Sequence, residues 1–226
     1  MKTPEETARL LRWELRAEWR DRFGLGSVLL YVIATVVIVY FAARELLEAG
    51  GGGAELFNAF YWITVFFGAT VACGRSFLRE GGRRHLYYYT LASPEALLVS
   101  KLAFNFVLLV AIAGLTWALL GFFTGVAYVI APAYFLGAIA LGCAGLSAIL
   151  TFVAALAARA GGSGTLMAVL SFPLVIPLLY VLTVAGAHAT DTASVGSPRT
   201  PLVLTAAIDL LAVAAGLVLF PFVWRD

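Results

Sequence analysis

The feature that most constrains this chain is a stretch of fifty-seven residues, from Leu102 to Ala158, that contains no Asp, Glu, Lys or Arg. A helix needs about 20 apolar residues to cross a hydrocarbon core of roughly 30 Å, so this stretch is long enough for two crossings. Gly121, Gly125 and Pro132 lie in its middle, and these residue types end helices and begin turns. The stretch predicts a membrane protein rather than a water-soluble domain.

Other apolar runs extend this interpretation to six membrane spans. We expect them at residues 25–43, 56–74, 100–123, 129–157, 165–187 and 201–223. The predicted fold class is therefore all-α, a polytopic membrane protein forming one domain over residues 1–226. Six spans leave no room for a soluble catalytic or nucleotide-binding domain, so we expect no enzyme site here and an energy source on another chain.

The positions of the basic residues predict the orientation. Thirteen of the fifteen Lys and Arg residues fall on one side of these spans, and only Arg44 and Arg199 fall on the other. Because basic residues stay on the cytoplasmic side, both termini and the 75–100 loop are expected to be cytoplasmic. This orientation also accounts for the basic residues without a nucleic-acid partner.

The N-terminal segment, residues 5–23, predicts an amphipathic helix lying in the membrane interface in contact with lipid. Four apolar residues recur every fourth position and form a narrow stripe: Leu11, Leu15, Trp19 and Phe23. Arginines fall on one flank of the stripe, and acidic residues including Glu14 fall on the other. A soluble surface helix is the alternative. The elbow into the first span is expected at Gly24 and Gly26.

The 75–100 loop is the most polar connection in the chain, and we interpret it as a cytoplasmic coupling loop that docks on a partner. Its candidate coupling residues combine charges with three consecutive tyrosines: Glu80, Arg83, Arg84, Tyr87, Tyr88 and Tyr89. Ser93 and Pro94 are expected to start the helix of the third span. The alternative is an aromatic anchor belt without a partner.

Two intramembrane features are candidates for function. Pro173 and Pro177 lie one helical turn apart in the fifth span, where they form either a hinge or a static kink. Asp209 is the only carboxylate well inside a span and needs a partner or a proton. Residues at comparable depth are its candidate partners: Thr64, Thr116 and Tyr180. A proton relay built on Asp209 is the minority interpretation.

The sequence predicts no metal site. His188 is expected at the outer end of the fifth span as an exposed loop residue, without a second His nearby to share a ligand. Cys73 and Cys143 fall inside spans without a metal-binding or redox spacing, and we expect both to be small packing residues.

Three segments together carry a resemblance to a known family. They are the Arg-rich segment from Leu10 to Arg20, the loop pattern Phe77-x-x-Glu80-Gly81 continued by Leu86, Pro94 and Lys101, and Arg159-x-Gly-Gly-x-Gly-x-Leu followed by Phe172-Pro173-Leu174-Val175-Ile176-Pro177. With these segments the chain resembles the CcmB family, the integral-membrane permease component of the ABC-type heme exporter of cytochrome c maturation.

The resemblance implies a subunit of a larger complex in a bacterial inner membrane. The implied partners are a cytoplasmic ABC ATPase that binds ATP, a heme-handling membrane subunit and a small single-span subunit. It implies that ATP hydrolysis drives release of heme to a chaperone outside, with heme as cargo and no cofactor bound by this chain. The alternatives are an ABC permease for a lipid or drug, a proton-coupled secondary carrier using Asp209, and a structural scaffold.

Overall fold

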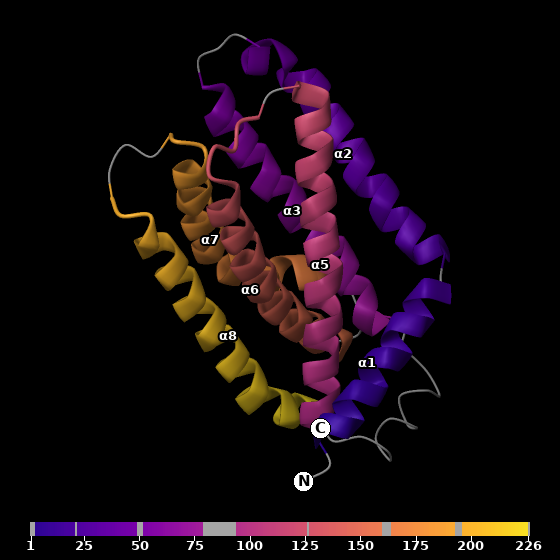
Figure 1. Cartoon of the computed structure of the whole chain (residues 1–226). Coiled ribbons are helices and arrows are strands. Elements are labelled where there is room, and N and C mark those ends of the chain that lie inside the picture. Colours follow the sequence, from indigo (N-terminus) through magenta and orange to yellow (C-terminus); the bar gives the residue numbers. More distant parts are fainter. Residues whose placement is uncertain are drawn as a thin grey trace.

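The computed structural model describes residues 3–20, 22–48, 52–78, 94–125, 127–159, 164–192 and 196–225, and over these residues the chain is all-helical (Figure 1). The helices, in chain order, are α1 (Thr3–Arg20), α2 (Arg22–Glu48), α3 (Gly53–Leu78), α5 (Pro94–Thr124), α6 (Pro132–Arg159), α7 (Gly164–Ala189) and α8 (Arg199–Arg225).

Six of these helices, α2, α3 and α5 to α8, are long and apolar enough to cross a membrane, which confirms the six predicted spans. The start of α1 and the end of α8 lie at the same end of the bundle, as an even number of crossings requires (Figure 1). We call this the terminal end and the opposite one the far end. The cytoplasmic assignment of the terminal end stays a prediction.

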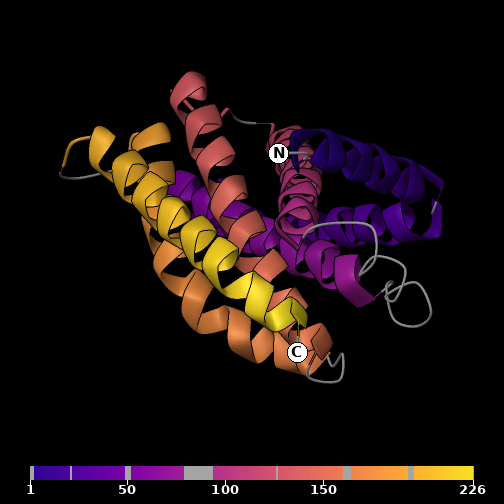
Figure 2. The ribbon, with the colours of Figure 1, turned by 90° about the horizontal axis from the view of Figure 1, so that it is seen from below.

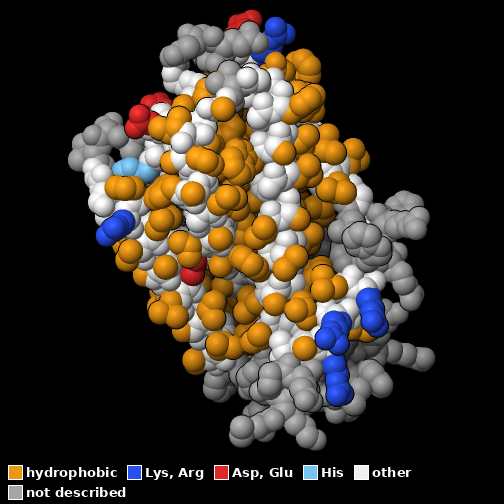
Figure 3. Space-filling model, in the orientation of Figure 1, with side chains coloured by type: hydrophobic (Ala, Val, Ile, Leu, Met, Phe, Trp, Pro, Cys, Tyr) orange, Lys and Arg blue, Asp and Glu red, His pale blue; other side chains and the backbone are white. Residues whose placement is uncertain are grey.

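α6 is the central helix of the bundle. Of the residues in its apolar stretch 72% are buried, against 17% for α8, and it packs against α3, α5, α7 and α8. Its buried side is rich in small residues, which let neighbouring helices approach closely: Ala138, Gly142, Cys143, Gly145, Ser147 and Ala148. Hydrophobic side chains cover most of the middle of the face seen in Figure 3, as expected of helices that face lipid.

The connection between α3 and α5 is shorter than predicted. Residues 75–78 belong to α3, and α5 begins at Pro94, as the Ser93-Pro94 pair predicted. Proline suits the first turn of a helix because its missing N–H would have no partner there. Residues 75–78 and 94–100 of the predicted loop are thus helical, residues 79–93 lie outside the described residues, and Lys101 lies inside α5.

The predicted elbow at Gly24 and Gly26 is wrong, because both glycines lie within α2. The N-terminal helix ends at Arg20, and α2 begins at Arg22. Glycine lowers helix propensity by roughly 1 kcal/mol, and membrane helices tolerate this cost more readily than soluble ones.

At the far end, the turn predicted between the third and fourth spans forms backbone hydrogen bonds with the end of α7. Gly125 follows α5 with a φ of 64°, a conformation that glycine adopts without strain. The backbone N–H groups of Ile130 and Ala131 both donate to the carbonyl oxygen of Ala189, at 3.0 and 3.2 Å. Pro132 then begins α6.

Candidate functional site

α1 packs against the terminal end of α5 rather than standing apart from the bundle (Figure 2). The residues of its inward side are half-buried and spaced at helical period: Thr7, Leu10, Leu11 and Glu14. Leu15 and Trp13 are exposed, at 43% and 45%. The inward side is thus centred on Leu10, Leu11 and Glu14, so Leu11 of the predicted stripe faces the bundle whereas Leu15 is exposed. The contact of the stripe with lipid stays a prediction. The side chains of Trp19 and Phe23 lie outside the described residues.

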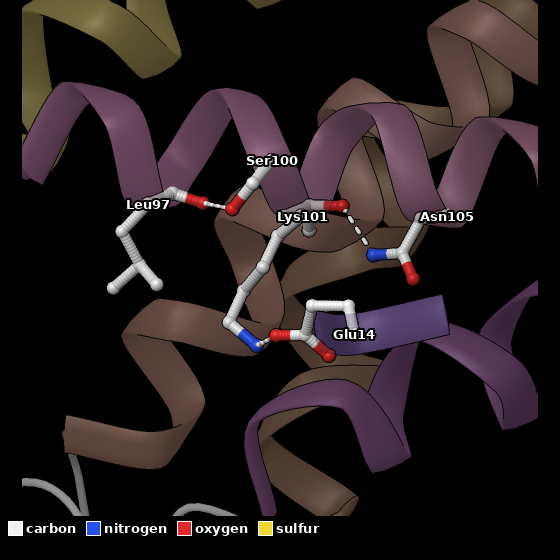
Figure 4. A network of polar contacts seen from close by, with 6 residues as sticks. Glu14, Leu97, Ser100, Lys101 and Asn105 are labelled. Atoms are coloured by element: carbon white, nitrogen blue, oxygen red, sulfur yellow. Dashed lines mark hydrogen bonds and ion pairs between the residues drawn. The ribbon is translucent and has the colours of Figure 1, made fainter. Parts of the chain in front are cut away.

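A buried ion pair joins α1 to α5 (Figure 4). The Lys101 ammonium donates to Glu14 Oε1 at 3.0 Å, and the two side chains are 0% and 16% exposed. Lys101 lies five residues inside the membrane span Ala96–Thr124. A charge at such a place needs an opposite charge and hydrogen bonds to offset its desolvation. The pair therefore joins α1 to α5 inside the bundle.

The structure places both members of this pair differently from the sequence prediction. Lys101 lies inside α5 and not at the end of a loop, and Glu14 faces the bundle, whereas it was predicted on the acidic flank of the apolar stripe. One signal was available, because Lys101 is the only charged residue between Glu95 and Arg159. A lone cation inside an apolar run predicts a buried acidic partner, although the run does not say which acid it is.

Polar contacts continue from α5 into α6 one turn further along. The side-chain amide of Asn105 donates to Thr151 Oγ1 at 2.7 Å, and Ser147 Oγ donates to the Leu102 carbonyl oxygen at 2.9 Å. Asn105 is fully buried, and its Oδ1 has no hydrogen-bond partner among the described residues. We call Glu14, Lys101, Asn105, Ser147 and Thr151 the polar junction, which links α1, α5 and α6.

Asp209 lies where α6, α7 and α8 meet. Its side chain is 8% exposed, and neither carboxylate oxygen has a hydrogen-bond partner among the described residues. The carboxylate packs on Gly145 of α6, so closely that a Cβ on this glycine would collide with Oδ1. Leu178 of α7 comes within 2.9 Å of the same Cβ position. The acid thus occupies space that only a glycine on α6 leaves free.

None of the three predicted partners of Asp209 is bonded to it. Thr116 donates to the Ile112 carbonyl oxygen at 2.8 Å, Thr64 Oγ1 is itself buried without a partner in the described part of the chain, and Tyr180 is 71% exposed. Depth in the membrane was the basis of this prediction. Depth does not specify the side of a helix on which a residue lies, and here the sides differ.

α7 continues through Pro173 and Pro177 as one helix, and both proline side chains are exposed. Phe172, Ile176 and Tyr180 are also exposed, at 45%, 58% and 71%. The prolines therefore lie on the outside of this chain, toward lipid or another subunit, rather than along a cavity. Their role as a hinge stays a prediction.

The far end contains an apolar pocket of about 490 Å³. Aromatic side chains form its walls and glycines leave its space open: Phe57, Trp117 and Tyr128 with Gly114, Gly121 and Gly125. No charged side chain is among its described lining residues. The pocket therefore suits apolar contents and offers no counter-charge for an anionic group.

Within the described ranges, no group of three or more His, Cys, Asp or Glu side chains could hold a metal ion. His188 belongs to the last turn of α7 and not to a loop, because α7 extends to Ala189. It is half-buried, and its ring lies edge-on to Tyr134 with the centroids 6.4 Å apart. Cys73 and Cys143 are buried free thiols in the core, as predicted.

The six predicted coupling residues, Glu80, Arg83, Arg84, Tyr87, Tyr88 and Tyr89, lie outside the described residues. Their role stays a prediction. The described residues on either side show where the segment is attached, since it leaves α3 at Leu78 and enters α5 at Pro94. It thus connects directly to the helix that carries Lys101 and Asn105.

A comparison with known families gives one match. The sequence profile of the family described as CcmB protein matches residues 5–224, nearly the whole chain. The chain belongs to the CcmB family. The match includes α1, so the N-terminal helix is part of the CcmB family unit and not an appendage. A comparison with curated proteins finds no significant match.

Proposed function

We propose that this chain is the membrane permease subunit of an ABC-type complex that exports heme, or releases a heme-loaded chaperone, during cytochrome c maturation. In this proposal the complex lies in a bacterial inner membrane, with the terminal end of this chain in the cytoplasm. ATP is bound and hydrolysed by a separate subunit, and heme is cargo rather than a cofactor of this chain. A heme-handling membrane subunit and a small single-span subunit are its further partners.

The observation that carries this proposal is the CcmB family match over residues 5–224 of a bundle with six apolar helices. The arrangement of the terminal end supports it. The 79–93 segment and the docked α1 both adjoin α5, so a cytoplasmic ATPase that contacts either one acts on the same span. Arg and aromatic side chains such as Arg84 and Tyr88 commonly supply the strongest contacts of an interface.

The second candidate is a proton-coupled carrier built on Asp209. The observation in its favour is the buried carboxylate without a hydrogen-bond partner among the described residues. Carriers of this kind pair broken helices in corresponding halves of the chain, whereas here the two prolines near the middle of a described span, Pro173 and Pro177, both belong to α7. The arrangement of the terminal end supports an ABC permease for a lipid or drug equally well, because that alternative differs only in its cargo.

Complementation tests the proposal. The chain and its partner genes are expressed in a bacterial strain that lacks its own cytochrome c maturation operon, and covalently bound heme in cytochrome c is measured. We expect holo-cytochrome c with the full set and none when this chain is omitted or when the ATPase subunit cannot hydrolyse ATP. Full maturation without this chain, or with the inactive ATPase, would overturn it.

A further inference from the structure

We propose that the Glu14–Lys101 ion pair is a mechanical joint that makes α1 and α5 move as one body, so that a force on α1 reaches the membrane spans. The inference rests on the proposed function in one respect, because it takes the source of the force to be the ATPase partner. The joint itself is a property of this chain. Glu14 and Lys101 act as positioning residues in it.

The burial of the pair distinguishes it from a surface contact. Exposed ion pairs are loose and hold no particular geometry, because water competes for both charges. Here the ammonium is 0% exposed and its carboxylate partner is 16% exposed, at 3.0 Å. Sliding α1 along α5 by one residue would separate the Glu14 carboxylate from the Lys101 ammonium. Buried polar groups fix the register of neighbouring helices in some helical assemblies, of which coiled coils are the best example.

The chemistry of α1 also argues against a helix held only by lipid. An interfacial helix directs its apolar residues to the membrane and its charges to water. In α1 the charged Glu14 points to the bundle, whereas Leu15 and Trp13 are left exposed beside it. The helix therefore has two attachments, one to α5 through the ion pair and one through exposed apolar side chains suited to the membrane surface.

The joint connects to the centre of the bundle through the rest of the polar junction. Asn105 lies one turn beyond Lys101 on α5 and bonds Thr151 of α6 at 2.7 Å, while Ser147 of α6 bonds the Leu102 carbonyl at 2.9 Å. α6 in turn packs against α3, α7 and α8. A displacement of α1 is thus passed to α5 and from there to the helix that touches most of the others.

A distance measurement tests the joint without reference to function. Cysteines replace the exposed Ala8 of α1 and Val99 of α5 in a chain whose Cys73 and Cys143 are changed to Ala, and spin labels are attached. We expect one narrow distance distribution in nanodiscs. Glu14→Gln should broaden it, the swapped pair Glu14→Lys with Lys101→Glu should narrow it again, and Glu55→Gln, which removes an exposed carboxylate from α3, should change nothing. A distribution that stays narrow with Glu14→Gln overturns the joint.

The coupling measurement uses the complete complex in nanodiscs and compares its ATP hydrolysis with that of the ATPase alone. Glu14→Gln should reduce the stimulation roughly fivefold or more, the range of typical coupling between sites, while all subunits still co-purify. The swapped pair should recover it, and Glu55→Gln should match the wild type. If the wild-type complex shows no stimulation, the proposed function fails while the spin-label result still decides the joint.

A double variant that is expected to fold serves as a control for misfolding. Replacing both charges, Glu14→Leu with Lys101→Met, should keep the fold and the assembly, because apolar substitutes for a buried ion pair are often neutral or stabilising. It should nevertheless broaden the label distribution and lose the stimulation, since the register is no longer fixed. Wild-type stimulation by this double variant would show that any contact suffices and would overturn the role of the ion pair.

Discussion

Replacing Gly145 by Ala should destabilise the bundle through a collision with Asp209. The added methyl group would overlap Asp209 Oδ1 and come within 2.9 Å of Leu178 Cδ2. The Leu178 side chain is a flexible apolar group that can shift by a few tenths of an ångström. The carboxylate has less freedom, because it is enclosed between α6, α7 and α8.

The size of the effect follows from two opposing contributions. Ala is favoured over Gly inside a helix by roughly 0.5–1 kcal/mol, and overpacking a well-filled interior typically costs about 1–3 kcal/mol. The expected net loss for Gly145→Ala is therefore about 1 kcal/mol, within a range of about 0–2.5 kcal/mol. Gly137 lies on the same helix with nothing within 4 Å of its Cβ position. Gly137→Ala should be neutral or slightly stabilising and is the matched control.

The assay is reversible unfolding of the purified chain in mild detergent titrated with SDS, followed by the fluorescence of its five tryptophans. The double variant Gly145→Ala with Asp209→Ala should recover most of the loss, because the colliding carboxylate is gone. Contacting residues usually show interaction energies of about 0.5–3 kcal/mol in such a cycle. The packing of Asp209 on Gly145 is refuted if Gly145→Ala is as stable as Gly137→Ala, or if the two changes are additive.

Three further predictions concern other parts of the chain. Thr151→Val should lower the free energy of unfolding by about 1 kcal/mol in the same assay, because it removes the acceptor of the Asn105 amide. Thr151→Ser keeps a hydroxyl and should be tolerated. Equal stability of the two variants would contradict the α5–α6 contact. In intact cells, an impermeant thiol reagent should label Gly51→Cys but not Gly82→Cys. The wild type is the control and should not be labelled, because its two cysteines are buried. Labelling of Gly82→Cys would reverse the predicted orientation. Asp209→Asn should retain cytochrome c maturation, because an amide has nearly the same shape as the acid. Pro173→Ala with Pro177→Ala should reduce maturation, because removing both prolines straightens α7. The opposite result for the two variants would favour the proton-coupled carrier.

The spans could be predicted well because the property that defines them, a long run without charged residues, is visible along the sequence itself. Charge-free length decides whether a segment crosses a bilayer, and Pro94 and Pro132 mark helix starts directly in the sequence. The six helices therefore lie where the apolar runs placed them. The length of the 75–100 loop was overestimated because basic residues near a membrane continue a helix as readily as they end it.

The side-chain contacts could not be predicted in the same way. Asp209 was matched to residues of equal depth, yet it packs on a glycine, which has no side chain to signal a partner. Glu14 was assigned to the acidic flank of the stripe because apolar periodicity orients a helix by its hydrophobic residues alone. Only the three-dimensional arrangement shows that the acid of α1 and the cation of α5 meet at 3.0 Å.

The proposal that this chain is the membrane subunit of an ATP-driven complex is tested by the ATP hydrolysis of its ATPase partner in nanodiscs with and without the chain. We expect that the two co-purify, that the chain changes the hydrolysis rate, and that Arg84→Glu with Tyr88→Ala in the 79–93 segment abolishes this change while the chain still folds. A chain that purifies alone and leaves ATP hydrolysis unaltered would contradict it.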